Sequence, residues 1–141
     1  MNRDELMTIL PHRPPMLLID EAHLDGDTSV GTYTVRGDEY FLQGHFPGQP
    51  IVPGVILCEM MAQSSCVLMA DALSGKLALF AGIEKVRFRR PVVPGDTVVF
   101  TCHQLSSKGP FHFMEGTGKV GDEVCVTGQL SFALVDPKAG E

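Results

Sequence analysis

Apolar and polar residues along the first 43 positions alternate in short runs that predict one helix and one hairpin. Apolar residues between positions 4 and 10 indicate a short amphipathic helix, which Pro11 closes. Residues 16–19 are predicted to start a strand, and the turn residues at positions 25–27 separate it from a second strand at residues 30–35. Residues 37–43 then form a short connecting element.

Residues 44–73 combine a stiff loop with a long apolar segment. The loop contains three prolines and three glycines, and Pro53 followed by Gly54 predicts a helix start there. About 20 residues of helix span about 30 Å, and a helix that is apolar nearly all round must be enclosed by other structure. Because polar residues such as Glu59 and Asp71 interrupt the segment, a core helix fits better than a membrane span.

The remaining chain predicts the enclosing structure. Five strands are expected at residues 77–83, 86–93, 97–105, 111–120 and 123–135. The last one alternates most clearly, with the even-numbered residues from 124 to 134 on one face. We therefore expect one α+β domain over residues 1–141, in which a curved antiparallel sheet of about six or seven strands wraps a long central helix.

Composition narrows the class of protein. The chain has 141 residues, a net charge of −6 and 44% hydrophobic residues, which argues against a nucleic-acid partner and against disorder. The polar start lacks the apolar core of a secretory signal, so a cytoplasmic protein is expected, with no membrane partner. Four cysteines without a Cys-x-x-Cys spacing predict buried free thiols. The histidines other than His45 show no metal-ligand spacing, and we assign them to structural or surface roles. They are His12, His23, His103 and His112.

Glu59 is the residue in the apolar segment that points most directly to chemistry. A carboxylate in an apolar helix faces solvent, finds a partner or stays protonated, because burying it ionised and unpaired is expensive. Gln63 lies four residues on, on the same helix face, and is expected to hydrogen-bond to it. His45 in the preceding loop is a candidate base. The free amides of Gly54 and Val55 at the helix start are candidates to polarise a carbonyl oxygen.

Four motifs together resemble a known family over nearly the whole chain. The motifs that carry the resemblance occupy residues 10–20, 44–55, 59–63 and 80–96. On these motifs the chain is similar to the (3R)-hydroxyacyl-acyl carrier protein dehydratases of type II fatty acid synthesis, the FabZ type.

The resemblance implies a hot-dog fold and a homodimer, often a trimer of dimers, with two active sites that each combine a His of one subunit with a Glu of the other. Carried over by position, His45 would remove the C2 proton, Glu59 would protonate the departing 3-hydroxyl, and the Gly54 amide would hold the thioester oxygen. No cofactor is expected. Departures at residues 16, 20–22 and 64–66 leave the acyl chain length and the pathway open.

Two other functions stay open on the residues alone. A thioesterase on the same scaffold would use a helix carboxylate to activate water, and a non-catalytic acyl-binding module would use Glu59 only as polar lining. A basic cluster in this acidic chain is a candidate docking patch for acyl carrier protein, with a solvated strand face as the alternative. Its residues are Lys85, Arg87, Arg89 and Arg90.

Overall fold

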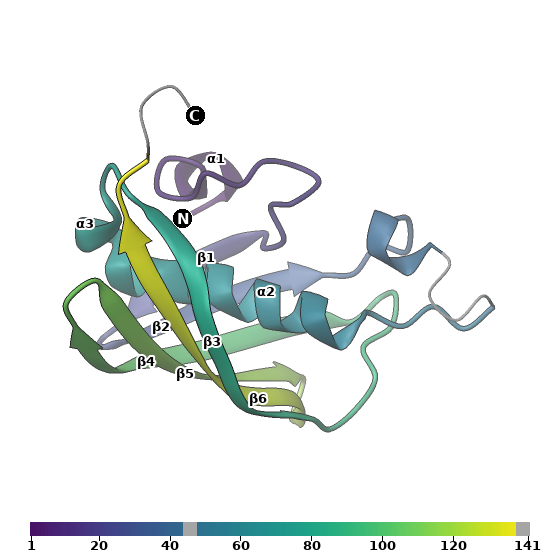
Figure 1. Cartoon of the computed structure of the whole chain (residues 1–141). Helices are drawn as coiled ribbons and strands as arrows, with labels where there is room; N and C mark the ends of the chain where they lie inside the picture. The colour runs from purple at the N-terminus through teal and green to yellow at the C-terminus, as the bar shows by residue number, and fades with distance from the viewer. Residues whose placement is uncertain (44–47, 138–141) are drawn as a thin grey trace.

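The computed structural model describes residues 1–43 and 48–137, and in them a helix lies along one face of a single antiparallel sheet (Figure 1). The six strands stand in the order β1-β2-β4-β5-β6-β3. Their bounds are β1 Glu21–Asp25, β2 Thr28–Thr34, β3 Leu77–Phe88, β4 Thr97–Lys108, β5 Phe111–Val120 and β6 Glu123–Val135. The expected α+β architecture is therefore confirmed, and β1 and β3 form the two edges of the sheet.

The predicted hairpin is confirmed, but its first strand begins later than residue 16. β1 pairs with β2 around a turn in which Gly26 has a φ of +64°, a value that suits glycine. Residues 17–19 are all buried instead of alternating between two faces. Leu18 donates its amide to the side chain of Gln63 rather than to a neighbouring strand. This segment is thus held by the central helix, and the chain bonds to β2 only from Asp20, whose amide donates to the Thr32 carbonyl, onward.

The N-terminal helix α1 (Arg3–Leu6) is shorter than predicted. Asn2 caps it, because its side chain accepts from the Glu5 amide while the Glu5 carboxylate accepts from the Asn2 amide. The helix stops where Thr8 bonds through its hydroxyl to the Glu5 carbonyl at 2.6 Å. Local side-chain bonds of this kind compete with helical ones, so the chain continues as turns up to residue 9.

The central segment is helical from Gly54 to Leu73, as predicted, but it is not one uniform α-helix. α2 (Gly54–Ser65) passes into a 3-10 turn, η2 (Cys66–Met69), and ends in α3 (Ala70–Leu73). Ser64, Ser65 and Cys66 each donate a side-chain hydrogen to a carbonyl three or four residues earlier. Three such bonds in succession explain why the helix tightens at this point.

The central segment is enclosed, as its apolar composition predicts. By length and composition it would pass as a membrane span, but 61% of it is buried inside the protein, so it is a core helix. Its close approach to the sheet depends on small residues. A side chain at Gly31 on β2 would come within 2.2 Å of the Ser64 hydroxyl. The even-numbered residues of β6 face the core from Val126 to Leu134, as predicted. At the start of the strand the prediction is wrong, because a register shift in the pairing with β5 leaves Cys125 fully buried and Val124 only partly buried.

β3 differs from the prediction of separate strands at residues 77–83 and 86–93. It is one strand that ends at Phe88 and pairs along its length with β6. Two register shifts interrupt this pairing, and at the second of them Lys85 has a φ of 53°. A bulge bends a strand without ending it, which explains why the pattern looked like two strands. All four cysteines are free and buried, as predicted.

Candidate active site

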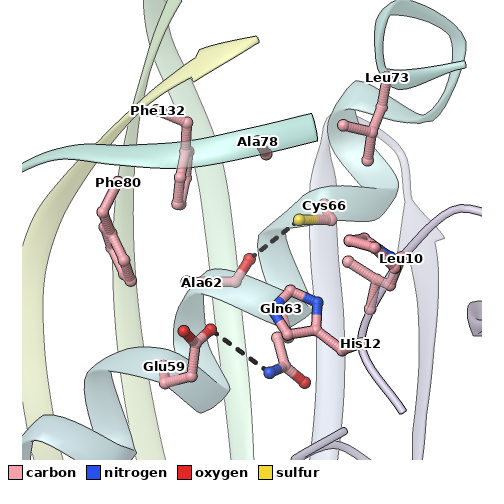
Figure 2. Close-up of a pocket in the computed structure, with 11 residues that line it drawn as sticks. Leu10, His12, Glu59, Ala62, Gln63, Cys66, Leu73, Ala78, Phe80 and Phe132 are labelled. Atoms are coloured by element: carbon pink, nitrogen blue, oxygen red, sulfur yellow. Dashed lines mark hydrogen bonds between the residues drawn. The ribbon is translucent and has the colours of Figure 1, made fainter. Parts of the chain in front are cut away.

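Glu59 projects from α2 into the interior and is only partly exposed (Figure 2). Burial disfavours the ionised carboxylate and raises the pKa of Glu59 above its ordinary value. A hydrogen bond from Gln63 Nε2 to Glu59 Oε2, 3.3 Å long, opposes this shift because it stabilises the charged form. The desolvation effect is the larger of the two, so Glu59 holds its proton to a higher pH than a solvated glutamate.

Gln63 is fully buried and uses both ends of its amide. The predicted bond to Glu59 is confirmed. In addition, its Oε1 accepts from the Leu18 amide at 2.8 Å, and its Nε2 donates to the Met16 carbonyl at 2.8 Å. These two bonds were not predicted, since they cross from α2 to a segment 45 and 47 residues away. They fix the amide so that its remaining hydrogen points at Glu59.

Glu59 and Gln63 line a cavity of about 30 Å³ between α2, the N-terminal segment, β3 and β6 (Figure 2). Most of its wall is apolar, and the rings of Phe80 and Phe132 lie against each other there with centroids 5.2 Å apart. Its other lining residues are Leu10, Pro11, His12, Ala62, Cys66, Leu73 and Ala78. A carboxylic acid in such a cavity can donate its proton to a neutral oxygen without competing water.

His12 also lines this cavity, although its sequence context predicted a structural or surface role. Burial lowers the pKa of His12. The imidazole is therefore neutral at physiological pH. Its position within the first motif, directly after Leu10 and Pro11, was the one sequence signal that set it apart from the three histidines outside the motifs, His23, His103 and His112.

Gly54 and Val55 do not share the cavity of Glu59. They line a separate groove of about 560 Å³ together with Phe88, the last residue of β3, and with Arg89 and other residues that follow this strand. Glu59 follows Gly54 by five residues, which turns the helix by about 140° and explains why the two face different sides.

Packing requires a glycine at position 54, whatever chemistry the start of the helix performs. A Cβ at this position would lie 2.7 Å from the Phe88 ring. The first helical amides with an acceptor are those of Ile56 and Leu57, which both bond to the Pro53 carbonyl. The amides of Gly54 and Val55 precede them and have no carbonyl to reach within the helix. His45 lies outside the described residues.

The predicted basic cluster is less regular than its sequence suggests. The bulge at Lys85 interrupts the alternation that would have put Lys85, Arg87 and Arg89 on one face, although all three are exposed. Arg90 pairs instead with Asp96 at 3.3 Å and with Glu123 at 3.9 Å. Its charge is thus compensated within the chain. In the described residues, no group of three or more His, Cys, Asp or Glu side chains is placed to hold a metal ion.

Comparisons with known proteins identify the family of this chain. The family described as ApeI-like, ApeI dehydratase, matches residues 21–129. The 3-hydroxyacyl-acyl-carrier-protein dehydratase FabZ of Acetivibrio thermocellus is 44% identical over 137 residues, covering 94% of this chain and 93% of that protein. The enzyme of the same name from Natranaerobius thermophilus is 43% identical, covering 94% and 96%. The chain belongs to the FabZ dehydratase family.

Solved structures place this FabZ family member on the hot-dog fold, which confirms the expected architecture. The dehydratase heterocomplex ApeI:P from Xenorhabdus doucetiae is similar with a TM-score of 0.78 and 24% identity, covering 96% of this chain and 93% of that one. A thioesterase from Haemophilus influenzae is similar with a TM-score of 0.65 and 14% identity, covering 87% and 82%. At these identities the likeness shows the fold alone, because the same fold carries both activities.

Proposed function

We propose that this chain dehydrates 3-hydroxyacyl thioesters carried on acyl carrier protein to the trans-2-enoyl thioesters, the activity for which its FabZ relatives are named. The observation that carries the proposal is Glu59, a carboxylic acid with a raised pKa that is held by Gln63 in a largely apolar cavity. No cofactor is needed, since the reaction moves only protons and one water.

In the proposed mechanism, His45 takes the proton from C2 of the substrate. The electron pair of the broken C2–H bond forms the C2–C3 double bond, and the C3–O bond breaks. Glu59 gives its proton to the departing hydroxyl, which leaves as water, and a carboxylic acid whose pKa is raised by burial suits the step. The free amides of Gly54 and Val55 would hold the thioester oxygen, where negative charge develops.

We propose that each active site draws on two copies of the chain. Gly54 and Glu59 face different sides of α2, so one copy would supply His45 and Gly54 to a site to which its partner supplies Glu59 and Gln63. The core face of β3 supports this assembly. Ile83 is 50% exposed although Leu130, directly opposite it on β6, is 2% exposed. A second copy is the simplest cover for this apolar edge, and dimers of this kind could assemble further into a trimer of dimers.

The substrate arrives on a protein, and the exposed basic residues are the proposed docking surface for it. Lys85, Arg87 and Arg89 remain members of the patch, whereas Arg90 is better assigned to holding the chain after β3 through its ion pairs. Acyl carrier protein is acidic, so this docking would weaken as salt increases. We also propose that the protein is cytoplasmic, because it would encounter acyl carrier protein there.

The test is to incubate the protein with 3-hydroxyacyl and enoyl thioesters on acyl carrier protein. Dehydration gives the absorbance of a conjugated enoyl thioester, a thioesterase gives free thiol, and a binding module gives neither. His45→Ala and Glu59→Gln are each expected to reduce turnover by at least about 100-fold, the usual contribution of a general acid or base, while the circular dichroism spectrum stays native. Turnover near the wild-type rate in either variant would falsify the mechanism.

A further inference from the structure

The cavity beside Glu59 is too small for an acyl chain and has the size of a hydroxyl group or a water molecule. Its volume of about 30 Å³ is somewhat larger than the roughly 10–15 Å³ that a cavity needs to hold one water molecule. A group of this size bound beside Glu59 would be held by whatever polar atoms the wall still offers. The hydrogen bonds of the lining residues decide which atoms these are.

Most polar groups in the wall of the cavity already form hydrogen bonds within the protein. Gln63 donates both amide hydrogens, to Met16 and Glu59, and accepts from Leu18. The Cys66 thiol donates to the Ala62 carbonyl at 3.4 Å. Apart from Glu59 itself, His12 is therefore the lining side chain in the described part of the protein that has hydrogen-bonding capacity to offer a ligand.

The His12 ring extends from the N-terminal segment toward the cavity (Figure 2). Its Nδ1 atom is buried and has no hydrogen-bond partner among residues 1–43 and 48–137. An unpaired acceptor costs less than an unpaired N–H group, so the ring proton belongs on Nε2. Nε2–H is then free to donate.

We propose that the imidazole of His12 donates a hydrogen bond to the 3-hydroxyl oxygen of the substrate, which leaves as the product water. This rests on the proposed dehydration. Glu59 supplies the proton and the C3–O electron pair leaves with the oxygen, while His12 is not itself ionised. A neutral donor fits the place, because an imidazolium beside Glu59 would favour the carboxylate and so oppose its action as an acid. His12 would thus recognise the hydroxyl that distinguishes substrate from saturated acyl chains.

The experiment compares two thioesters of equal chain length on pantetheine, one with the (3R)-hydroxyl and one saturated. Binding is measured by calorimetry on Glu59→Gln protein, with and without a second change at His12. His12→Leu removes both ring nitrogens and keeps an apolar side chain of moderate size, whereas His12→Gln keeps an N–H donor. We expect His12→Leu to weaken binding of the hydroxyacyl thioester about fivefold to tenfold, the effect of one hydrogen bond, and to leave the saturated one within about twofold. His12→Gln should retain most of the selectivity.

Leu10→Val is the matched control, because it alters the apolar wall next to His12 without touching a polar atom. It should change the binding of both thioesters by the same factor. Equal losses for both thioesters in His12→Leu would overturn the proposal in favour of a packing role, and so would unchanged binding of both. Turnover of the wild-type protein is recorded in parallel. Absence of enoyl product there would refute the proposed function, whereas the hydroxyl selectivity reports on His12 in either case.

Discussion

Glu59 is held between an environment that opposes its charge and a partner that favours it. Burial raises its pKa, and the hydrogen bond from Gln63 moderates that rise. The folded chain therefore keeps a proton on Glu59 over a pH interval in which the unfolded chain has already released it. In that interval the unfolded state binds fewer protons, so the free energy of unfolding falls as pH rises. The acid function that we propose for Glu59 thus costs stability at neutral and alkaline pH.

Glu59→Gln should recover this stability while it abolishes activity. Glutamine cannot ionise, so the variant is expected to unfold about 2–4 °C above the wild type at pH 8 and at nearly the same temperature at pH 4. Scanning calorimetry at one protein concentration measures both values. Glu21→Gln on β1, an exposed position, is the control and should shift the midpoint by less than about 1 °C. A variant less stable than the wild type at pH 8 would contradict a raised pKa of Glu59 in the folded protein.

The candidate site could be predicted from the sequence only where its partners are close along the chain. Glu59 and Gln63 lie one helical turn apart, so their hydrogen bond followed from spacing alone. The bonds from Gln63 to residues 16 and 18, and the place of His12 in the same wall, depend on how the N-terminal segment packs on α2. Five histidines were available, and no local pattern says which of them a distant helix will bury.

At the scale of elements, the strands were predictable where turn residues punctuate an alternating pattern. β5 and β6 have the bounds that the sequence predicts. β3 was predicted as two strands because its bulges break the alternation without ending the pairing with β6. The helix start at Gly54 was predicted from Pro53, but the 3-10 turn at η2 was not. That turn results from side-chain bonds of Ser64, Ser65 and Cys66, which propensity does not include.

The exposed edge of β3 gives a prediction about assembly. The proposed dimer buries Ile83, so a charged side chain there would have to be desolvated without a partner. Ile83→Lys is therefore expected to give monomers in analytical ultracentrifugation and to lower turnover by at least about 100-fold, because the two halves of each site separate.

Leu24→Lys is the control at the opposite edge of the same sheet. Leu24 on β1 is 54% exposed, close to the 50% of Ile83, and a lysine there should keep both the dimer and the activity. Circular dichroism establishes that both variants fold. If Ile83→Lys sediments like the wild type, β3 is not the interface. If Leu24→Lys alone dissociates, the partner covers β1 instead.

At the scale of the whole molecule, the arrangement of residues around α2 predicts that two inactive proteins can restore each other. A His45→Ala chain still carries Glu59, and a Glu59→Gln chain still carries His45. If each site combines these residues from two chains, a mixed dimer contains one intact site and one that lacks both groups. Random exchange makes half of the dimers mixed, so the mixture should recover about a quarter of wild-type turnover. Each variant alone stays inactive at every concentration.

The subunits are exchanged by mild denaturation and refolding together, and turnover is compared with the two variants refolded separately and then combined. A site built from His45 and Glu59 of the same chain would show no recovery, because no exchange of subunits can bring the two intact residues into one chain.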